Sequence, residues 1–386
     1  MRAVTILAAT TDQATAGEVA VVAFCVGAFV LAVLLLLRIR PITGSPQAAR
    51  QAPAAHDPSR AAGTAAPVRP ALKLPAVVVN PTKFPDVDAV RLQISRVCAE
   101  LGWADPLWLT TTQADPGEGQ ARRAVAEGAD LVMACGGDGT VRSVAQALAG
   151  SGVPMGLLPT GTGNLLARNL DMRLDDLLGA VRTALSGRDR RVDVGRMVVD
   201  DRPEQVFLVM AGMGFDALIM QGAQADLKAK VGSAAYVVAG ARHLNGRRVR
   251  LTLSVDDGKV IHRRSRMVVV GNCGRLLGGL VLMPDAQVDD GLLDVVSLSP
   301  KGIVGWAAIA GRLVTRQRKG HALVERWVGR TVTISAAEPQ ISQVDGDPMG
   351  EATVLRIRVD PGALVVRVSR GSTAVTSAQA VMRALR

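Results

Sequence analysis

The segment Gly136–Thr140, with the sequence GGDGT, contains the residues whose types and spacing most clearly suit chemistry. It follows the apolar run Leu131–Cys135 and precedes the helix-like run Val141–Leu148. A turn between a strand and a helix presents backbone N–H groups to a phosphate, and glycines let the backbone approach that phosphate closely. Since a carboxylate repels phosphate, we expect Asp138 to act through a metal ion or as a proton acceptor. The pattern predicts a nucleotide-dependent enzyme of phosphoryl transfer.

A second glycine loop follows at Gly161–Asn164, with the sequence GTGN. It also comes after a predicted strand, Val153–Leu158, and opens a predicted helix. Two such loops at neighbouring strand ends can hold one polyphosphate from two directions, whereas a single glycine loop is often only a structural turn. Asn80, at the end of the first predicted strand, is expected either to bind a ligand or to cap the turn.

Three further aspartates, Asp216, Asp290 and Asp345, stand in glycine-containing contexts. Each of them alone is most often part of a β-turn. Phosphoryl transfer, however, needs Mg²⁺ on the phosphates and a group that accepts the proton of the acceptor hydroxyl. These carboxylates are therefore candidates for both tasks.

The predicted elements divide the globular part of the chain in two. Over residues 76–190 short apolar strands alternate with helices, which favours a nucleotide-binding α/β domain with a parallel sheet. Over residues 191–370 the segments are short and rich in Val, with turn signals such as Asp256–Gly258, which predicts a mostly antiparallel β-sandwich domain. We expect the ligand site in a cleft between the two domains. A C-terminal helix is predicted over residues 371–386.

An uncharged apolar run, Val19–Leu37, precedes the globular part. As a helix it would span about 28 Å, close to the thickness of a hydrocarbon core, so we predict a single transmembrane helix in an N-terminal anchor, residues 1–40. Arg38 and Arg40 follow directly, and the positive-inside rule then places the protein in the cell membrane with its catalytic body in the cytoplasm. A cleaved signal peptide is the alternative. Residues 41–75, rich in Ala and Pro, are predicted to be a disordered linker.

The composition limits the classes of partner. The chain of 386 residues has a formal net charge of +11, which suits anionic lipid headgroups, phosphorylated substrates or nucleic acid. Aromatic residues make up only 3% of the chain, which argues against stacking platforms for single strands, and we predict no nucleic-acid partner. The four cysteines are far apart in apolar surroundings, so we predict buried free thiols and no zinc site.

The ordered set GGDGT, GTGN, PDAxxxDDGLLDV and VDGDP resembles the motifs of the diacylglycerol kinase catalytic-domain family, which includes bacterial lipid kinases and sphingosine kinases. The resemblance covers roughly residues 75–370. It implies an ATP-binding α/β domain, a β-sandwich domain and a cleft where a lipid hydroxyl takes the γ-phosphate of ATP, with Mg²⁺ as cofactor. The ATP-binding residues that it implies are Asn80, Gly136, Gly137, Asp138, Gly139, Thr140, Gly161, Thr162, Gly163 and Asn164.

The same resemblance implies roles for the aspartates. Asp138 and Asp216 would belong to a network of water and Mg²⁺ on the phosphates. Asp345 would be the general base for the lipid hydroxyl. Asp290 resembles a ligand of a structural metal ion, assisted by backbone carbonyls around Gln287 and Leu292. In sphingosine kinases the aspartate of the GGDG-type motif is assigned as the base, so Asp138 and Asp345 compete for that role.

Two departures from the family pattern bear on affinity. Phe84 and Pro85 follow Asn80-Pro81 where family members usually have a glycine-containing loop, so this loop is expected to be stiffer. Asp347 stands in place of the glutamate of the family's DGE pattern. Because aspartate reaches one methylene less far, we expect a weaker contact at this position.

A lipid acceptor stays in the bilayer, so the predicted partners are a membrane lipid and an anionic membrane surface. The segment Ile303–Trp327 could present a basic amphipathic face to that surface or form an ordinary helix with a charged side. Three functions remain open: a kinase for diacylglycerol or a related lipid, an NAD kinase, whose family shares GGDGT, and a non-catalytic nucleotide-binding membrane protein. The later motifs argue against the NAD kinase. The oligomeric state stays open, with a homodimer as one alternative.

Overall fold

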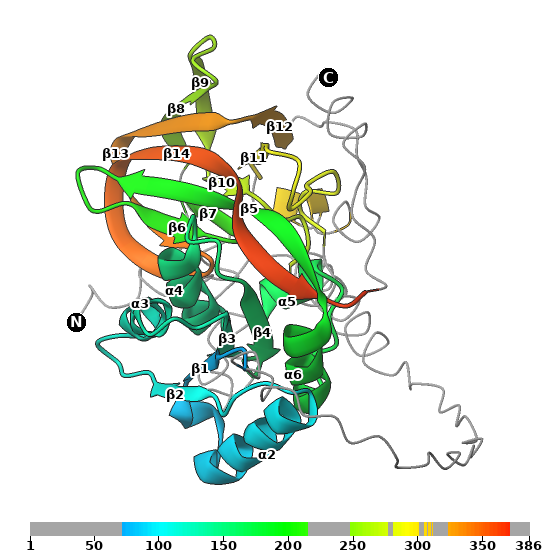
Figure 1. Cartoon of the computed structure of the whole chain (residues 1–386). Helices are drawn as coiled ribbons and strands as arrows, with labels where there is room; N and C mark the ends of the chain where they lie inside the picture. Colours follow the sequence, from blue (N-terminus) through cyan, green and yellow to red (C-terminus); the bar gives the residue numbers. More distant parts are fainter. Residues whose placement is uncertain are drawn as a thin grey trace, which may run out of the picture. The chain divides into compact units, whose positions relative to one another are not determined.

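The computed structural model describes residues 72–214, 248–276, 281–300, 305–306, 308–309, 311 and 323–370. Within this part of the chain an α/β domain is followed by an antiparallel β domain, as predicted (Figure 1). The predicted anchor, residues 1–40, the predicted linker up to residue 71 and the predicted helix over residues 371–386 lie outside the described residues.

The first domain is a parallel sheet covered by helices on both faces. Its strands lie in the order β2-β1-β3-β4, and every pairing among them is parallel. The elements are β1 (Pro75–Val79), the 3-10 helix η1 (Pro81–Lys83), α2 (Val87–Glu100), β2 (Leu107–Thr110), α3 (Glu118–Ala126), β3 (Leu131–Gly136), α4 (Asp138–Leu148), β4 (Met155–Pro159), α5 (Leu165–Asn169) and α6 (Leu177–Ser186).

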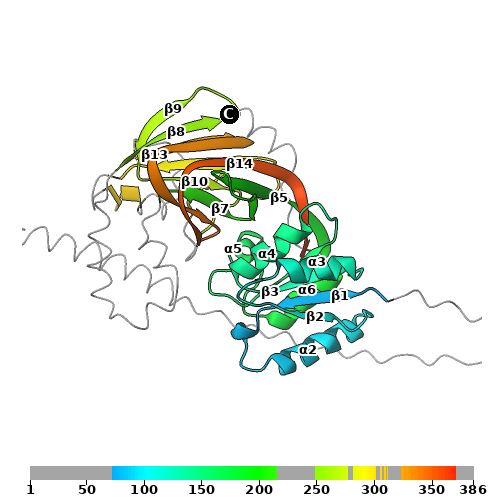
Figure 2. The same cartoon turned by 90° about the vertical axis from the view of Figure 1, so that its left-hand side faces the viewer.

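β1 is buried along its whole length because helices cover both of its faces. Successive side chains of a strand point to opposite faces, so Ala76 and Val78 join the core cluster that includes α3 and α4. Val77 and Val79 join the cluster with α2 and α6 on the other face. Figure 2 shows α2 on one side of the sheet and α3 and α4 on the other.

The second domain is built from antiparallel pairs around its own core cluster. Its strands are β5 (Arg188–Val199), β6 (Gln205–Phe207), β7 (Met210–Met213), β8 (Val249–Val255), β9 (Ile261–Ser265), β10 (Met267–Gly271), β11 (Leu293–Leu298), β12 (Val324–Gly329), β13 (Thr331–Val344) and β14 (Asp347–Val368). The apolar run Val206–Met210 is divided between β6 and β7, with Leu208 and Val209 in a bend between them. This bend forms part of the candidate site.

β14 connects the two domains. It pairs in antiparallel fashion with β13 and β5, and Val366 near its end pairs in parallel with Met155 of β4. Leu364, Val366 and Val368 belong to the same core cluster as the buried side of α4. The last described strand therefore completes the sheet of the first domain.

The prediction of a single-pass membrane protein with a membrane location is wrong for the described part of the chain. No helix there is long and apolar enough to cross a membrane. The longest described helix is α2 with 14 residues, which is about 21 Å, whereas a hydrocarbon core is about 30 Å thick. The predicted span Val19–Leu37 itself lies outside the described residues.

Two smaller predictions can be compared with the structure. Cys98, Cys135 and Cys273 are free and buried, as predicted. The segment Ile303–Trp327, predicted as a helix or an amphipathic face, enters strand β12 at Val324. The end of that segment is therefore part of the β-sheet.

Candidate active site

The predicted phosphate loops lie side by side at the carboxyl ends of neighbouring parallel strands. Thr160, after β4, donates its backbone N–H to the carbonyl of Gly136 at the end of β3, with N···O 3.1 Å. Asn80, after β1, donates its backbone N–H to the carbonyl of Cys135 at 2.9 Å. The carboxyl edge of a parallel sheet is the usual place for a ligand in this class of fold. The three predicted segments are thus brought together.

The two glycine loops touch each other through their backbones. A Cβ atom on Gly161 would lie 2.6 Å from the Cα of Gly137, which is closer than real Cβ contacts allow. The second loop therefore needs glycine at position 161 for a reason of space, whereas a Cβ on Gly137 would lie at an ordinary 3.4 Å. The contact leaves the backbone of both loops at one edge of the sheet, where it can face a phosphate chain.

Asp138 links the first loop to the second. Its carboxylate accepts the backbone N–H of Asn164 at 2.8 Å and that of Leu165 at 2.6 Å, at the start of α5. Burial raises the pKa of Asp138, while these two hydrogen bonds lower it and the nearby charge of Asp347 raises it further. Because both of its oxygens accept backbone N–H groups of the second loop, Asp138 holds the two loops together.

The remaining loop residues shape the turns. Asn164 has left-handed backbone angles, φ 48° and ψ 47°, and its buried side chain donates to the carbonyl of Gly161 at 2.6 Å and accepts its N–H at 3.1 Å. Thr140 is buried in the first turn of α4, whereas Thr162 is exposed at the tip of the second loop. The side chain of Asn80 accepts hydrogen bonds from Thr82, so it caps η1. Gly139 and Gly163 both border the carboxylates of the site.

Asp345 lies in the tight turn between β13 and β14, with φ 48°. One of its carboxylate oxygens accepts the backbone N–H of Leu208 at 2.8 Å, and the other accepts those of Val209 and Met210, both at 2.9 Å. Burial raises the pKa of Asp345 to about 6, although these hydrogen bonds and the charge of Arg142 lower it. A carboxylate has about four lone-pair sites, so three backbone donors leave one for a substrate hydroxyl.

The turn that carries Asp345 reaches across to the first domain. Asp347, two residues further on, pairs with Arg142 of α4 at 2.7 Å. Arg142 is mostly covered, with 15% of its side chain exposed, whereas Asp347 is half exposed. A Cβ on Gly139 would lie 3.6 Å from an oxygen of Asp347. The VDGDP and GGDGT motifs, which are far apart in the sequence, therefore meet in space.

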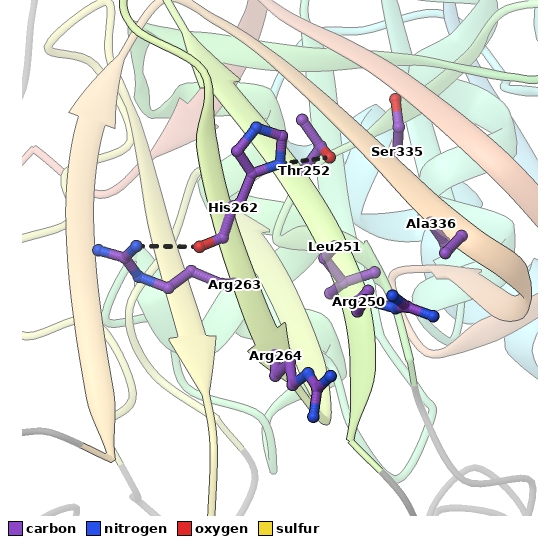
Figure 3. A pocket seen from close by; sticks show the side chains of 9 residues that line it. Arg250, Leu251, Thr252, His262, Arg263, Arg264, Ser335 and Ala336 are labelled. Atoms are coloured by element: carbon purple, nitrogen blue, oxygen red, sulfur yellow. Dashed lines mark hydrogen bonds between the residues drawn. The ribbon is translucent and has the colours of Figure 1, made fainter.

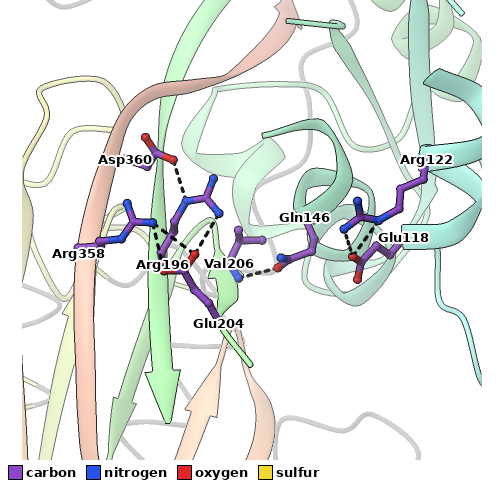
Figure 4. Close-up of polar contacts among 8 residues, drawn as sticks. All are labelled: Glu118, Arg122, Gln146, Arg196, Glu204, Val206, Arg358 and Asp360. Atoms are coloured by element: carbon purple, nitrogen blue, oxygen red, sulfur yellow. Dashed lines mark hydrogen bonds and ion pairs between the residues drawn. The ribbon is translucent and has the colours of Figure 1, made fainter. Parts of the chain in front are cut away.

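A second contact fixes α4 against the β domain. Gln146 on α4 accepts the backbone N–H of Val206 in β6 at 2.8 Å (Figure 4). Arg142 and Gln146 are four residues apart, so they lie on one face of the helix. Neither residue stands in one of the motifs that the sequence alone brings out. Their spacing of four and eight residues after Asp138 is the signal that could have pointed to them.

Asp347→Asn is expected to lower kcat/KM for ATP by about tenfold, because it frees Arg142 and loosens the position of the turn that carries Asp345. The unfolding free energy should change by less than about 1 kcal/mol, since the pair is partly exposed. Asp347→Glu, which keeps the charge, should retain most of the activity. Steady-state kinetics on purified variants would measure this.

The matched control is Asp360→Asn. Asp360 pairs with Arg196 at the same distance, 2.7 Å, and Arg196 also contacts Glu204 (Figure 4). None of these three residues belongs to the glycine loops or to the turn of Asp345. Equal loss of activity in the two Asp→Asn variants would show that the Arg142 contact has no special role.

The predicted metal ligands are only partly brought together. Asp290 lies in the turn before β11, where its carboxylate accepts the backbone N–H of Leu292 at 3.1 Å. The backbone N–H of Gly291, which lies between Asp290 and Leu292, donates to the carboxylate of the buried Asp193 at 2.6 Å. Asp216 lies outside the described residues. Among the described residues no group of three or more His, Cys, Asp or Glu side chains is placed to hold a metal ion, so a metal at Asp290 stays a prediction that depends on backbone carbonyls.

Comparisons with known proteins agree with this arrangement. Residues 76–197 match the family model of the diacylglycerol kinase catalytic domain, and residues 209–368 match that of the YegS C-terminal NAD kinase beta sandwich-like domain. A probable lipid kinase YegS-like protein of Pseudomonas aeruginosa is 35% identical over 267 residues, which cover 66% of this chain and 83% of that protein. A diacylglycerol kinase of Mycobacterium tuberculosis is 34% identical over 173 residues, which cover 45% of this chain and 56% of that protein.

Solved structures extend the likeness in fold. A diacylglycerol kinase of Bacillus anthracis superposes with a TM-score of 0.60 at 22% identity, covering 78% of this chain and 98% of that one. The two matched domains, the order of the motifs and the meeting of GGDGT with VDGDP lead to one assignment. The chain belongs to the diacylglycerol kinase catalytic-domain family, and its second domain is of the YegS type.

Proposed function

We propose that this protein is an ATP-dependent lipid kinase that transfers the γ-phosphate of ATP to the hydroxyl of diacylglycerol or a related membrane lipid. The observation that carries the proposal is the contact between Asp347 and Arg142 at 2.7 Å. It brings the turn of Asp345, a buried carboxylate with a pKa raised to about 6, to the helix that begins at the first glycine loop. A proton acceptor and a phosphate cradle are the two parts that such a transfer needs.

Two unsatisfied polar groups support a nucleotide at the loops. The hydroxyl of Thr160 and the Nε of Arg142 are buried and have no hydrogen-bond partner among the described residues. Buried polar groups are normally paired, so such groups at a site suit a missing ligand. Phosphate oxygens accept from both kinds of donor. Together with the backbone of Gly136–Gly139 they would orient the γ-phosphate toward the second domain.

Mg²⁺ fits the same place. Asp138 and Asp347 are close enough for the charge of Asp347 to raise the pKa of Asp138. A divalent cation beside two carboxylates would relieve that repulsion, and Mg²⁺ in kinase sites is held by one or two carboxylates together with substrate phosphates. When bound, the ion would neutralise charge that develops on the transferred phosphate. Asp138 and Asp347 are the described residues that would hold it, with Asp216 as a predicted third.

Asp345 would act as the base. Its pKa of about 6 lets it stay ionised at neutral pH while remaining a competent proton acceptor. The three backbone donors fix the direction of its carboxylate, and the bond between its own N–H and the carbonyl of Met210, at 2.8 Å, holds the turn. In the reaction the carboxylate would accept the proton of the lipid hydroxyl as the oxygen attacks phosphorus, and ADP would leave.

The test is a transfer assay with γ-labelled ATP, Mg²⁺ and mixed micelles that contain diacylglycerol, a sphingoid base or a polyprenol, with NAD as a soluble acceptor. We expect a labelled phospholipid, identified by mass spectrometry, and no labelled NADP. Phosphorylation of NAD alone would replace the lipid kinase with an NAD kinase. Binding of ATP with no product from any acceptor would favour a non-catalytic nucleotide-binding protein.

A further inference from the structure

A concave pocket of about 500 Å³ opens on strands β8, β9 and β13 of the second domain (Figure 3). The residues that matter for its chemistry are Arg250, Thr252, His262, Arg264 and Ser335. None of them belongs to the phosphate loops or to the turn of Asp345. We call this concavity the β8–β9 pocket.

Two arginines stand at paired positions of the neighbouring strands that line this pocket. Arg250 of β8 and Arg264 of β9 are direct partners in the antiparallel register, so their side chains leave the sheet on the same face. Both are exposed, and within the described residues neither forms an ion pair or a side-chain hydrogen bond. Like charges directly opposite on neighbouring strands are destabilising. The repulsion between Arg250 and Arg264 therefore lowers the stability of the free protein at this concave surface.

Other arginines near the pocket have hydrogen-bond or ion-pair partners. Arg263 is bound by Glu325 of β12 through contacts of 2.8 and 3.0 Å, and Arg248 donates to the carbonyl of Ser299 at 3.0 Å. Among the arginines that line the pocket, Arg263 pairs with a carboxylate, whereas Arg250 and Arg264 have no ion pair within the described residues. The pocket therefore has a local excess of positive charge.

Protection of a sheet edge explains only part of this pattern. Among the described strands β9 pairs with β8 alone, and charged side chains on an edge strand discourage pairing with other chains. That reason applies to His262 and Arg264 on β9. It applies less to Arg250, because its strand β8 pairs with β9 and, from Leu251 to Val255, also with β13.

Hydrogen-bond donors continue from the arginine pair across the same face. Thr252 is the register partner of His262 on one side and of Ser335 on the other. The Thr252 hydroxyl and the His262 Nδ1 are 3.4 Å apart (Figure 3). The pocket thus combines two guanidinium groups with two hydroxyls and an imidazole. Guanidinium groups bind phosphate oxygens in pairs of hydrogen bonds, and hydroxyls add single donors.

We propose that the β8–β9 pocket binds a phosphate monoester. Its two unpaired positive charges match the charge of about −1.5 to −2 that such a group carries at neutral pH, whereas a phosphodiester or a carboxylate carries only one. The ligand bridges Arg250 and Arg264 and turns their repulsion into a stabilising contact. The site is independent of the proposed kinase activity, since it shares no residue with the phosphate loops.

The test uses the full chain with a non-hydrolysable ATP analogue present to occupy the loops. One arm titrates inorganic phosphate by calorimetry. A second arm measures flotation with phosphatidylcholine vesicles that contain phosphatidate, a monoester, or phosphatidylglycerol, a diester, at equal surface charge. We expect Arg250→Gln with Arg264→Gln to weaken binding at least tenfold. If the double variant loses binding of inorganic phosphate in the calorimetric arm, the ligand is a free phosphate group. If it loses binding only to the phosphatidate vesicles, the ligand is a lipid headgroup.

The control carries the same charge change elsewhere. Arg91→Gln with Arg96→Gln removes two exposed arginines from α2 and should leave binding within twofold. Arg264→Glu places a carboxylate opposite Arg250, so it should abolish phosphate binding and raise the thermal midpoint of the free protein. Any of three results would overturn the proposal. The two double variants could weaken binding equally, the protein could bind the monoester and the diester equally well, or the unmodified chain could show no binding in either arm.

Discussion

Asp345→Asn is expected to lower kcat by about 10²–10⁴ while leaving the affinity for ATP nearly unchanged, because it removes the proton acceptor and leaves the phosphate loops in place. The replacement also has a structural effect. An amide in place of the carboxylate turns one acceptor toward backbone N–H groups of Leu208, Val209 and Met210 into a donor. Leaving one buried N–H unpaired costs about 1–3 kcal/mol of unfolding free energy. Turnover and nucleotide binding must therefore be measured below the melting range of the variant.

The pH dependence separates the base from a purely structural carboxylate. With the pKa of Asp345 raised to about 6, kcat should rise with pH through about 6 and then level off. The residual activity of Asp345→Asn should lack this rise. The unfolding free energy depends on pH in the opposite direction. The folded state holds the proton more tightly than the unfolded one, so this group's contribution to the unfolding free energy decreases as pH rises from about 4 to 6.

Asp256→Asn is the control for the structural effect. Asp256 also uses its carboxylate to accept backbone N–H groups, those of Arg330 at 2.6 Å and Thr331 at 2.8 Å, in a turn far along the chain from the loops. It should lose stability but keep kcat and its pH profile. Should Asp345→Asn behave like Asp256→Asn, Asp345 is not the base, and Asp138 becomes the candidate to examine.

Gly161→Ala is expected to lower kcat/KM for ATP by about 10², the second large effect. The new Cβ would lie 2.6 Å from the Cα of Gly137, and this neighbour is backbone that cannot rotate away. The loops must separate by a sizeable fraction of an ångström, and a displacement of about 1 Å in a positioned group costs about 10² in rate. The same overpacking should lower the unfolding free energy by about 1–3 kcal/mol. Titration with a fluorescent nucleotide would follow the loss of affinity.

Gly311→Ala is the matched substitution, since a Cβ there meets nothing within 4 Å. It should leave the kinetics unchanged and raise the unfolding free energy by about 0.5–1 kcal/mol, because Gly311 is helical. Gly137→Ala offers a finer comparison, because its Cβ would lie at an ordinary 3.4 Å from the Cα of Gly161. Its loss of stability should be smaller than that of Gly161→Ala. The reverse order would contradict the close crossing of the two loops.

The parts of the molecule that depend on local patterns could be predicted from the sequence. Strands and helices alternate over the first domain, mostly strands follow in the second, and both glycine loops stand at strand ends, as predicted. These features follow from residue type and spacing over a few positions. The cap of α2 by Asp86, which accepts the N–H of Ala89 at 2.9 Å, is of the same kind.

Contacts between distant segments could not be predicted in this way. Nothing near Asp138 in the sequence indicates that its oxygens bind the backbone of residues 164 and 165. The shorter reach of Asp347 was expected to weaken its contact, yet Arg142 on α4 supplies a partner at 2.7 Å. A hydropathy pattern also led to a membrane location that no described helix supports. In each case the outcome depends on which elements become neighbours.

The pairing of β14 with β4 has a consequence for biosynthesis. A ribosome makes β4, which ends at Pro159, long before it makes Val366, the residue that pairs with Met155. Until then one edge of the first domain's sheet has no partner from β14, and the core around Leu364, Val366 and Val368 is incomplete. Contacts of such long sequence separation slow folding. A fragment that stops at the end of the nucleotide-binding domain would expose this edge and aggregate, so the two domains are best expressed as one chain.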